Sequence, residues 1–227
     1  KIIGLFEDAA DVSKSPVQDA AAPGRFKYAD ANGRNSTTGK LTGKPDGFIT
    51  EDDRIHFGNP NPKFTLGLNI GINYKGFDFS TFFYGSFGND VLNHIKSFTD
   101  ILSQRLTPKS KTALYDSWTP DHKNAKAPIL ENELNFSNAS VPNTYILEKG
   151  TYLRNKTMIL GYAFPKNLLQ KIKVERFRIY VQTVNLFTIT NYRGLDPELP
   201  GSSSAYGIDV GNYPSQKQYL VGLNLSF

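Results

Sequence analysis

The clearest pattern in the chain is a strict alternation of apolar and polar residues over positions 64–74. Large apolar residues occupy every second position, and Thr, Gly or Asn fills the positions between them. A period of two predicts a β-strand. Lys75-Gly76 reads as a two-residue turn, so the sequence predicts an antiparallel hairpin that continues to residue 87, with Tyr74 opposite Phe77.

The two faces of this hairpin differ in character. One face is apolar and has aromatic residues at both ends, while the other is polar or small. Ten residues at about 3.3 Å each, tilted by about 40°, span roughly 25 Å, which matches the outward apolar band of an outer-membrane barrel. A hairpin of a soluble β-sandwich also alternates, but the strand length and the spacing of the rings favour the membrane.

Three further strands are predicted, at 152–164, 174–188 and 217–227. The phase of the first blurs near Arg154 and Lys156, which indicates a β-bulge or a segment above the bilayer. Short connections at 75–76 and 165–173 alternate with long ones at 89–150 and 189–216. Outer-membrane barrels alternate short periplasmic turns with long extracellular loops in this way.

These strands predict an all-β fold, a transmembrane antiparallel β-barrel. Too few strands are present to close a barrel, and open edges are not tolerated in lipid. We therefore expect the C-terminal arc of a larger barrel with long extracellular loops. Residues 1–63 are expected to form an extracellular loop region, and residues 64–227 the C-terminal barrel strands and loops.

Composition removes several classes of function. The chain of 227 residues has no Cys, and its three His share no metal-ligand spacing. The net charge of +5 is spread along the chain, which argues against nucleic acid as a partner. No stretch approaches 18 consecutive apolar residues, so a transmembrane helix is not expected. The chain begins at Lys1 without an initiator Met or signal peptide, so we expect a processed chain, a truncated chain or a fragment.

No motif of an enzyme is present, and we expect no catalytic activity. GxSxG, HExxH and phosphate-cradling Gly-rich motifs are missing from the sequence. Glu131 and Glu133 could be read as an acid and base for glycoside cleavage. Without a pocket signal around them, solvated loop residues are the better interpretation.

Short motifs occur in an order that is familiar from one family. They are Ala22–Asp30, Gly47–Arg54, Gly58–Phe64, Tyr74–Phe79, Ser117–Pro120 with Asn124-Ala125, Tyr152–Arg154, Leu160–Tyr162, Asn185–Phe187, Asp196–Glu198, Gly207–Asp209, Tyr213-Pro214 and Gly222–Phe227. Together they make the chain resemble the C-terminal part of a SusC/RagA-type TonB-dependent outer-membrane transporter from Bacteroidetes. The terminal Phe227 also resembles the signal read by the barrel-assembly machinery, although Leu220 departs from the usual polar residue.

The resemblance implies a multi-pass barrel of about 22 strands in the outer membrane, with an N-terminal plug. It implies a SusD-like surface lipoprotein over the extracellular mouth, and uptake of a glycan or peptide nutrient driven by TonB. The plug and the segment that contacts TonB would lie upstream of Lys1.

One loop offers a possible calcium site. Without residues 34–45, the segment 30–53 has the spacing of an EF-hand-like loop. Calcium would be held by the side chains of Asp30, Asn32, Asp46 and Asp53 and by the carbonyl of Phe48. A metal-free Asx-turn hairpin is the alternative, because the insertion separates the first ligands from the others.

The loop before the last strand offers candidate contacts to substrate or to the lid. They are Tyr192, Arg193, Tyr206 and Tyr213. Aromatic faces with polar groups are typical of ligand sites, but aromatics also anchor interfaces between proteins.

Two alternatives to a nutrient importer stay open. The barrel could act as a scaffold within a larger outer-membrane assembly. The second alternative is a secreted β-sandwich binding module. It predicts that residues such as Leu68, Ile70, Phe83 and Leu223 pack inside a soluble body.

Overall fold

The computed structural model describes residues 1–102, 108–170, 173–199 and 205–227. The chain divides into two compact units. The loop unit comprises Lys1–Gly58, Leu92–Glu148 and Ile208–Val210, and the sheet unit comprises Asn59–Val91, Lys149–Gly207 and Gly211–Phe227. Residues 92–148, which lie between two strands of the sheet in sequence, thus belong with the N-terminal residues.

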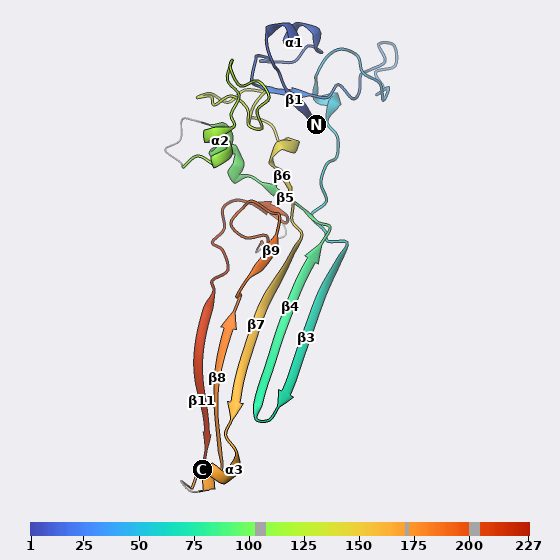
Figure 1. The fold of residues 1–227 in the computed structure, drawn as a ribbon. Helices are drawn as coiled ribbons and strands as arrows, with labels where there is room; N and C mark the ends of the chain where they lie inside the picture. Colours follow the sequence, from blue (N-terminus) through green and yellow to red (C-terminus); the bar gives the residue numbers. More distant parts are fainter. Residues whose placement is uncertain (103–107, 171–172, 200–204) are drawn as a thin grey trace. The chain divides into compact units, whose positions relative to one another are not determined.

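The sheet unit is built on long antiparallel strands in the order β11-β8-β7-β4-β3 (Figure 1). Their bounds are β3 Phe64–Tyr74, β4 Phe77–Phe87, β7 Tyr152–Ala163, β8 Arg176–Val184 and β11 Gln218–Ser226. The short β9, Thr188–Thr190, pairs with β7. The all-β antiparallel architecture predicted from the sequence is confirmed.

The predicted hairpin has the predicted register. Tyr74 faces Phe77 and Phe64 faces Phe87, with every pair between them in step. Lys75 and Gly76 both have positive φ, 45° and 88°, as the tight turn of a two-residue hairpin requires.

The bulge predicted near Arg154 and Lys156 is present. Phe82 pairs with Thr157 and Phe83 with Asn155, so Lys156 is an extra residue between them. The strand predicted at 174–188 is shorter than expected, because Asn185 adopts a left-handed conformation with φ of 51° and ends β8 at Val184. Its amide donates to the Lys156 carbonyl at 3.1 Å, so the bulge and the end of β8 are linked.

The apolar face of the sheet is open. Leu68, Ile70 and Leu223 are 45%, 40% and 64% exposed, and Phe83 is half-buried. Rings flank this face at both ends, with Phe64 stacked on Phe87 at 4.7 Å between ring centroids. A soluble sandwich would bury these residues, so their exposure fits contact with hydrocarbon and contradicts the β-sandwich alternative.

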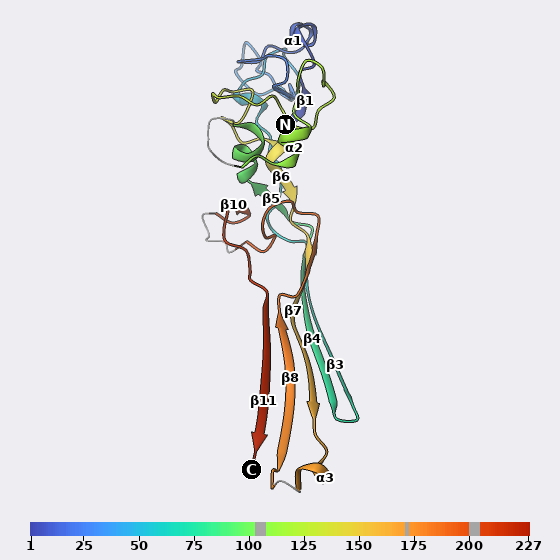
Figure 2. The same ribbon diagram turned by 60° about the vertical axis from the view of Figure 1, so that its left-hand side comes forward.

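Short and long connections alternate between the ends of the sheet, as predicted. The turn after β3 and the connection containing α3, Lys166–Leu169, lie at the end where the chain also stops (Figure 2). The long connections leave the opposite end. Among the described residues no helix is long and apolar enough to cross a membrane.

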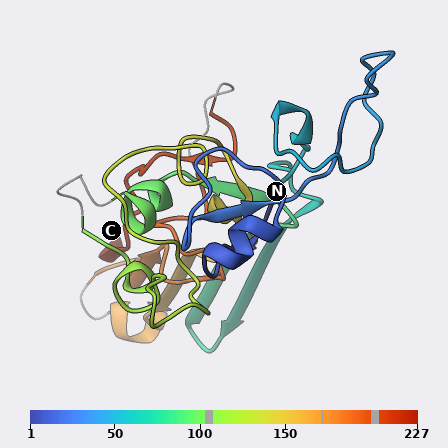
Figure 3. The same cartoon turned by 90° about the horizontal axis from the view of Figure 1, so that it is seen from above.

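The described residues of the loop unit are mostly irregular, and the helices and strands among them are short. They are β1 Ile2–Leu5, α1 Ala9–Lys14, β2 Phe26–Tyr28, the 3-10 helices Glu51–Asp53 and Thr144–Ile146, the π-helix Ser97–Ile101, α2 Lys111–Tyr115 and β10 Ile208–Asp209. The strands β5 Asp90–Asn93 and β6 Leu147–Lys149 have residues in both units. Its core gathers Phe26, Tyr28, Ile49 and Ile101. The hairpin of residues 34–45 extends away from the rest of the unit (Figure 3).

Candidate functional site

An ion network lies on the polar face of the sheet unit at its bulged end. Arg154 of β7 binds Asp196 and Glu198, with Nη2–Oδ1 and Nη1–Oε2 distances of 2.5 and 2.6 Å. Lys156 binds both oxygens of Glu198, at 2.6 and 2.7 Å. The Arg154 and Asp196 side chains are only 4% and 7% exposed. Since a buried charge without a partner is costly, the two cations and two carboxylates hold one another in place.

The bulge is what allows both cations to join this network. Thr157 lies on the polar face, so in a regular strand residues 156 and 154 would both lie on the apolar face. The extra residue shifts the pairing of everything before it by one position. Here Arg154 pairs opposite Tyr84, a polar-face position, and Lys156 still reaches Glu198. The irregular phase of the sequence therefore has a specific outcome, which is a pair of cations on the polar face.

The Asp196 carboxylate accepts hydrogen bonds from two separate points of the loop between β9 and β11. Its Oδ1 accepts the amide of Glu198 at 2.9 Å, and its Oδ2 accepts the amide of Ser215 at 2.8 Å. Burial alone would raise the pKa of Asp196, but the Arg154 guanidinium and the two amides outweigh it and hold the pKa below its ordinary value. The carboxylate is therefore ionised throughout the neutral range and closes the loop on the strand.

A second ion pair crosses a whole strand of the same face. Arg178 of β8 binds Asp78 of β4, with Nε–Oδ1 and Nη2–Oδ2 distances of 2.8 and 2.5 Å. The pair passes over Gly161 of β7, where a Cβ atom would collide with both side chains. The Tyr180 ring lies over Gly222 of β11 in the same manner. Glycine in one strand thus makes room for a large side chain of its neighbour.

The four predicted contact residues differ in their exposure to solvent. Tyr192 is buried, Arg193 is exposed, and Tyr206 and Tyr213 are 50% and 85% exposed. Of the four, Tyr206 lines a cavity of the sheet unit. A role of these residues in binding substrate or lid stays a prediction.

The 30–53 loop is closed by hydrogen bonds from its own backbone. Asp30 accepts the amides of Asp46 and Gly47 at 3.2 and 2.7 Å. The buried Asp53 accepts the amides of Ala31 and Asn32 on Oδ1, at 2.7 and 3.0 Å, and that of Thr50 on Oδ2 at 2.8 Å. The insertion leaves these turns intact, because its ends stay close to each other.

Part of this arrangement suits calcium and part does not. Asp46 accepts the amide of Phe48, and the tight turn at Gly47 has a positive φ of 88°, as in a calcium loop. Asp53, however, directs both oxygens at amides, whereas the last ligand of such a loop faces the metal with both oxygens. Within the described residues no three His, Asp or Glu side chains converge on a possible metal position. Calcium at this loop therefore stays a prediction.

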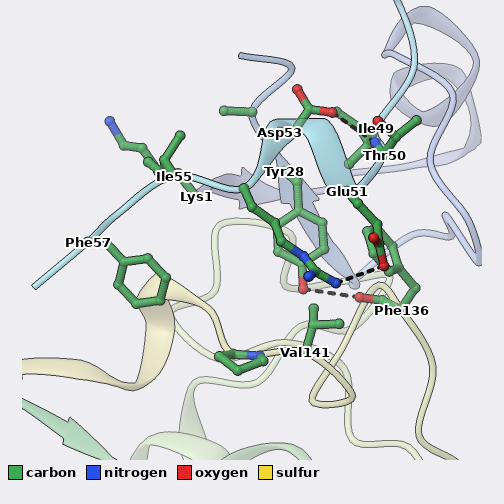
Figure 4. Close-up of a pocket in the computed structure, with 13 residues that line it drawn as sticks. Lys1, Tyr28, Ile49, Thr50, Glu51, Asp53, Ile55, Phe57, Phe136 and Val141 are labelled. Carbon is green, nitrogen blue, oxygen red and sulfur yellow. Dashed lines mark hydrogen bonds and ion pairs between the residues drawn. The ribbon is translucent and has the colours of Figure 1, made fainter. Parts of the chain in front are cut away.

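The loop unit also contains a cavity of about 490 Å³ (Figure 4). Its walls are largely apolar and include Tyr28, Ile49, Phe136 and Val141, while the exposed pair of Glu51 and Arg54 stands at its edge. The Tyr28 hydroxyl donates to the Phe136 carbonyl at 3.1 Å, and burial raises the pKa of Tyr28 to about 12. The hydroxyl is therefore neutral and structural.

Glu131, weighed above as a catalytic group, has a structural role. It binds Arg25 with its Oε1 2.5 Å from Nη2, and its Oε2 accepts from the amide groups of Asn135 and Asn138. Burial alone would raise the pKa of Glu131, but Arg25 and the Asn138 side chain lower it overall. A carboxylate held in this way is a poor proton donor.

Comparison with known proteins relates this geometry to a family. No protein-family model matches the chain. TonB-dependent receptor P3 of Formosa agariphila is 31% identical over 216 residues, which cover 90% of this chain and 19% of that protein. TonB-dependent receptor SusC of Bacteroides thetaiotaomicron is 29% identical over 200 residues, 87% of this chain and 18% of that protein. The chain belongs to the TonB-dependent receptors of the SusC/RagA type.

Solved structures of this type have the same fold. The RagAB peptide importer in its open-open state matches with a TM-score of 0.68 and 25% identity, over 100% of this chain and 22% of that chain. Its closed-closed state matches with a TM-score of 0.65 and 27% identity, over 86% of this chain and 20% of that chain. The sheet unit is therefore a segment of the wall of an antiparallel transmembrane barrel. The chain spans about a fifth of the length of the curated relatives it matches.

For a SusC/RagA-type receptor, the apolar face of the sheet is the outer surface and the polar face lines the interior. The ion network of Arg154 thus lies on the inner side of the wall. Sequence reasoning noted Arg154 and Asp196 only as parts of separate motifs. The two residues are 42 positions apart in the chain, and apart from the irregular phase at Lys156 no local sequence pattern predicts their ion pair.

Proposed function

We propose that this chain forms part of the barrel wall of an outer-membrane nutrient importer. The importer would take up an oligosaccharide or a peptide, powered by TonB through parts of the receptor outside this chain. A SusD-like surface lipoprotein would cover its outer opening.

The observation that carries the proposal is the two-faced sheet together with the identity of its relatives. An apolar face as open as that of Leu68 and Leu223 is stable against lipid, while the opposite face carries buried ion pairs. Proteins with this sequence pattern are named TonB-dependent receptors, and matching structures are of a peptide importer. Both are consistent with transport through the barrel.

Deletion of the whole gene tests the proposal. The deletion strain is expected to lose growth on one nutrient polymer or peptide mixture in a panel, and to regain it when the intact gene is restored. A restored gene whose TonB-contacting segment is removed provides the matched control, since it should reach the membrane and fail to import. Unchanged growth of the deletion strain on every nutrient would contradict import.

Purification from the outer membrane separates the importer from a scaffold. Copurification of a nutrient-binding lipoprotein supports the importer. Copurification of assembly or secretion machinery in its place, with normal growth of the deletion strain, supports the scaffold.

A further inference from the structure

A row of aromatic rings crosses the apolar face of the sheet unit at the end where the short connections lie. The ring centroid of Tyr162 of β7 is 4.6 Å from that of Phe77 of β4 and 5.1 Å from that of Phe164. Phe164 in turn stacks on Phe177 of β8 at 4.9 Å. These four rings, the ring band, join the turn after β3 to the connection that contains α3. Aromatic rings at the edge of an apolar band lie at the depth of the lipid head groups.

Unpaired lysines lie in the two connections beside the ring band. Lys75 is in the turn after β3, Lys166 is the first residue of α3, and Lys173 follows α3, and all three are exposed. None of these three, which we call the lysine rim, forms an ion pair with a residue that the structure describes. In the sequence, residues 75–76 and 165–175 contain four Lys and a single acidic residue, Glu175. The charge at this end is therefore positive and is not balanced within the two connections.

The Lys75 side chain lies on the lipid side of the wall. Its Nζ is 5.2 Å from the centroid of the Tyr74 ring. Tyr74 stands opposite Phe77 on the apolar face and is 65% exposed. An ammonium group over an exposed outward ring is placed where a lipid phosphate can reach it.

The connection that contains α3 begins and ends at the same face. Phe164 precedes it and Phe177 follows it, and their stacked rings both belong to the ring band. Between Lys166 and Lys173, Leu168 is 55% exposed. Exposed apolar side chains next to lysines are typical of segments that lie at a membrane surface.

Acidic lipid is the partner that fits this combination. Lysine ammonium groups bind phosphate as point charges, and positive side chains next to a membrane are attracted to its acidic lipids. The short turns of an outer-membrane barrel lie on the periplasmic side, so the lysine rim meets the inner leaflet. A zwitterionic head group carries an amine of its own, which reduces its attraction to lysine.

We propose that the lysine rim binds acidic phospholipids of the inner leaflet. The phosphates would lie against Lys75, Lys166 and Lys173, and the acyl chains would run along the ring band. This inference depends on the barrel wall and not on what the receptor imports. It adds an electrostatic contact to the insertion of the apolar face.

Photocrosslinking in the intact receptor tests the proposal at the residues concerned. The receptor would be placed in lipid nanodiscs with a trace of phosphatidylglycerol or of phosphatidylcholine that carries the same photoactivatable acyl chain. Crosslinked peptides would be mapped by mass spectrometry. At the two connections, we expect phosphatidylglycerol to exceed phosphatidylcholine about fivefold or more, the effect of roughly 1 kcal/mol for each lysine near acidic lipid.

Substitutions of single and multiple lysines show whether the lysine rim causes this preference. Lys75→Gln should lower it at the turn after β3, and the triple variant with Lys166→Gln and Lys173→Gln should bring both connections close to equal labelling. Arg176→Gln is the matched control at the same end, because Arg176 stands opposite Ser226 on the polar face.

A second control changes the same net charge far away in sequence. It combines Lys14→Gln, Lys40→Gln and Lys44→Gln, three exposed lysines of the loop unit, and should leave the preference unchanged. Equal amounts of heat-modifiable barrel in the outer membrane would show that all variants fold.

Several outcomes would overturn the proposal. Equal labelling by the two lipids at both connections would show that acidic lipid is not selected. A preference that the lysine rim variants retain, or that Arg176→Gln or the loop-unit variant removes equally well, would show that the lysine rim does not cause it. Growth of the deletion strain tests the importer function separately, so either conclusion can fail alone.

Discussion

Arg178 of β8 binds Asp78 of β4 although β7 lies between them. The contact spans three strands of the wall and exists only because position 161 has no side chain. The Arg178 and Asp78 side chains are 16% and 30% exposed. Their ion pair links two strands that are not neighbours, whereas backbone hydrogen bonds in a sheet join only neighbouring strands.

Gly161→Ala should break this pair while leaving the strand in place. The new methyl group would lie 2.5 Å from Asp78 Oδ1, and the flexible Arg178 side chain would move away. We expect the free energy of unfolding of the full receptor to fall by about 1–3 kcal/mol. Gly71→Ala is the control on the same face, since nothing lies within 4 Å of its Cβ position. Equal melting temperatures of the two variants would show that the pair contributes nothing.

A positive charge should be tolerated on only one of the two faces of β3. Leu68→Arg places a cation on the apolar face near the middle of the strand, at a cost of about 2–4 kcal/mol at the bilayer midplane. Asn69→Arg places the same group on the polar face. We expect the amount of receptor in the outer membrane, measured by immunoblot of sarkosyl-insoluble membranes, to fall for Leu68→Arg alone. Equal loss in both variants would contradict the assignment of the faces.

The loop fastened by Asp196 should loosen only in acid. Because the pKa of Asp196 is lowered in the folded protein, the ionised carboxylate stabilises the fold above its ordinary pKa of about 3.9. This contribution is lost as the pH falls through the lowered pKa of the folded state. Asp196→Asn should therefore lower the melting temperature at pH 7, and the difference from the wild type should shrink below about pH 4. The exposed Glu175→Gln provides a control with no such difference, and a gap that is independent of pH would contradict this role.

Asp53 should stabilise the closed 30–53 loop more than its neighbour Asp52 does. Asp53→Ala leaves three part-buried amides without an acceptor, at a total cost of about 1–3 kcal/mol, because water can reach part of them. Asp52→Ala removes one ion pair to the exposed Arg34, which contributes less. Hydrogen exchange of the receptor should show faster exchange at Ala31, Asn32 and Thr50 in Asp53→Ala. Equal exchange in the two variants would argue against this closure.

Calcium binding to the same loop can be tested separately. If the predicted site forms, calorimetric titration of calcium into the intact receptor should give heat that Asp46→Ala abolishes. Asp53 would then have to turn toward the metal, so the exchange of Ala31 and Asn32 should change with calcium. A titration without heat would contradict the site.

The strands could be predicted from the sequence because their determinants are local. Alternation between two faces and a two-residue turn at Lys75 fix the register of β3 and β4, and every predicted pair is present. The irregular phase at Lys156 predicted the bulge for the same reason. The early end of β8 was missed, because only the left-handed conformation of Asn185 reveals it.

The inner face could not be predicted to the same extent. Arg154 meets Asp196, and Arg178 meets Asp78, over 42 and 100 residues of chain. No period or spacing encodes contacts between residues so far apart in sequence. In the loop unit the same holds for Arg25 and Glu131, which are 106 residues apart. Candidate contacts such as Tyr192 were chosen by residue type alone, and burial places this one inside the protein.

The glycines beneath Arg178 and Tyr180 have a consequence for the width of the barrel's interior. Long side chains that lie flat across a neighbouring strand take little of the bore, whereas the same groups standing upright would narrow it. The wall can therefore present charge and aromatic surface toward the interior of the barrel with side chains that stay close to the backbone of the sheet.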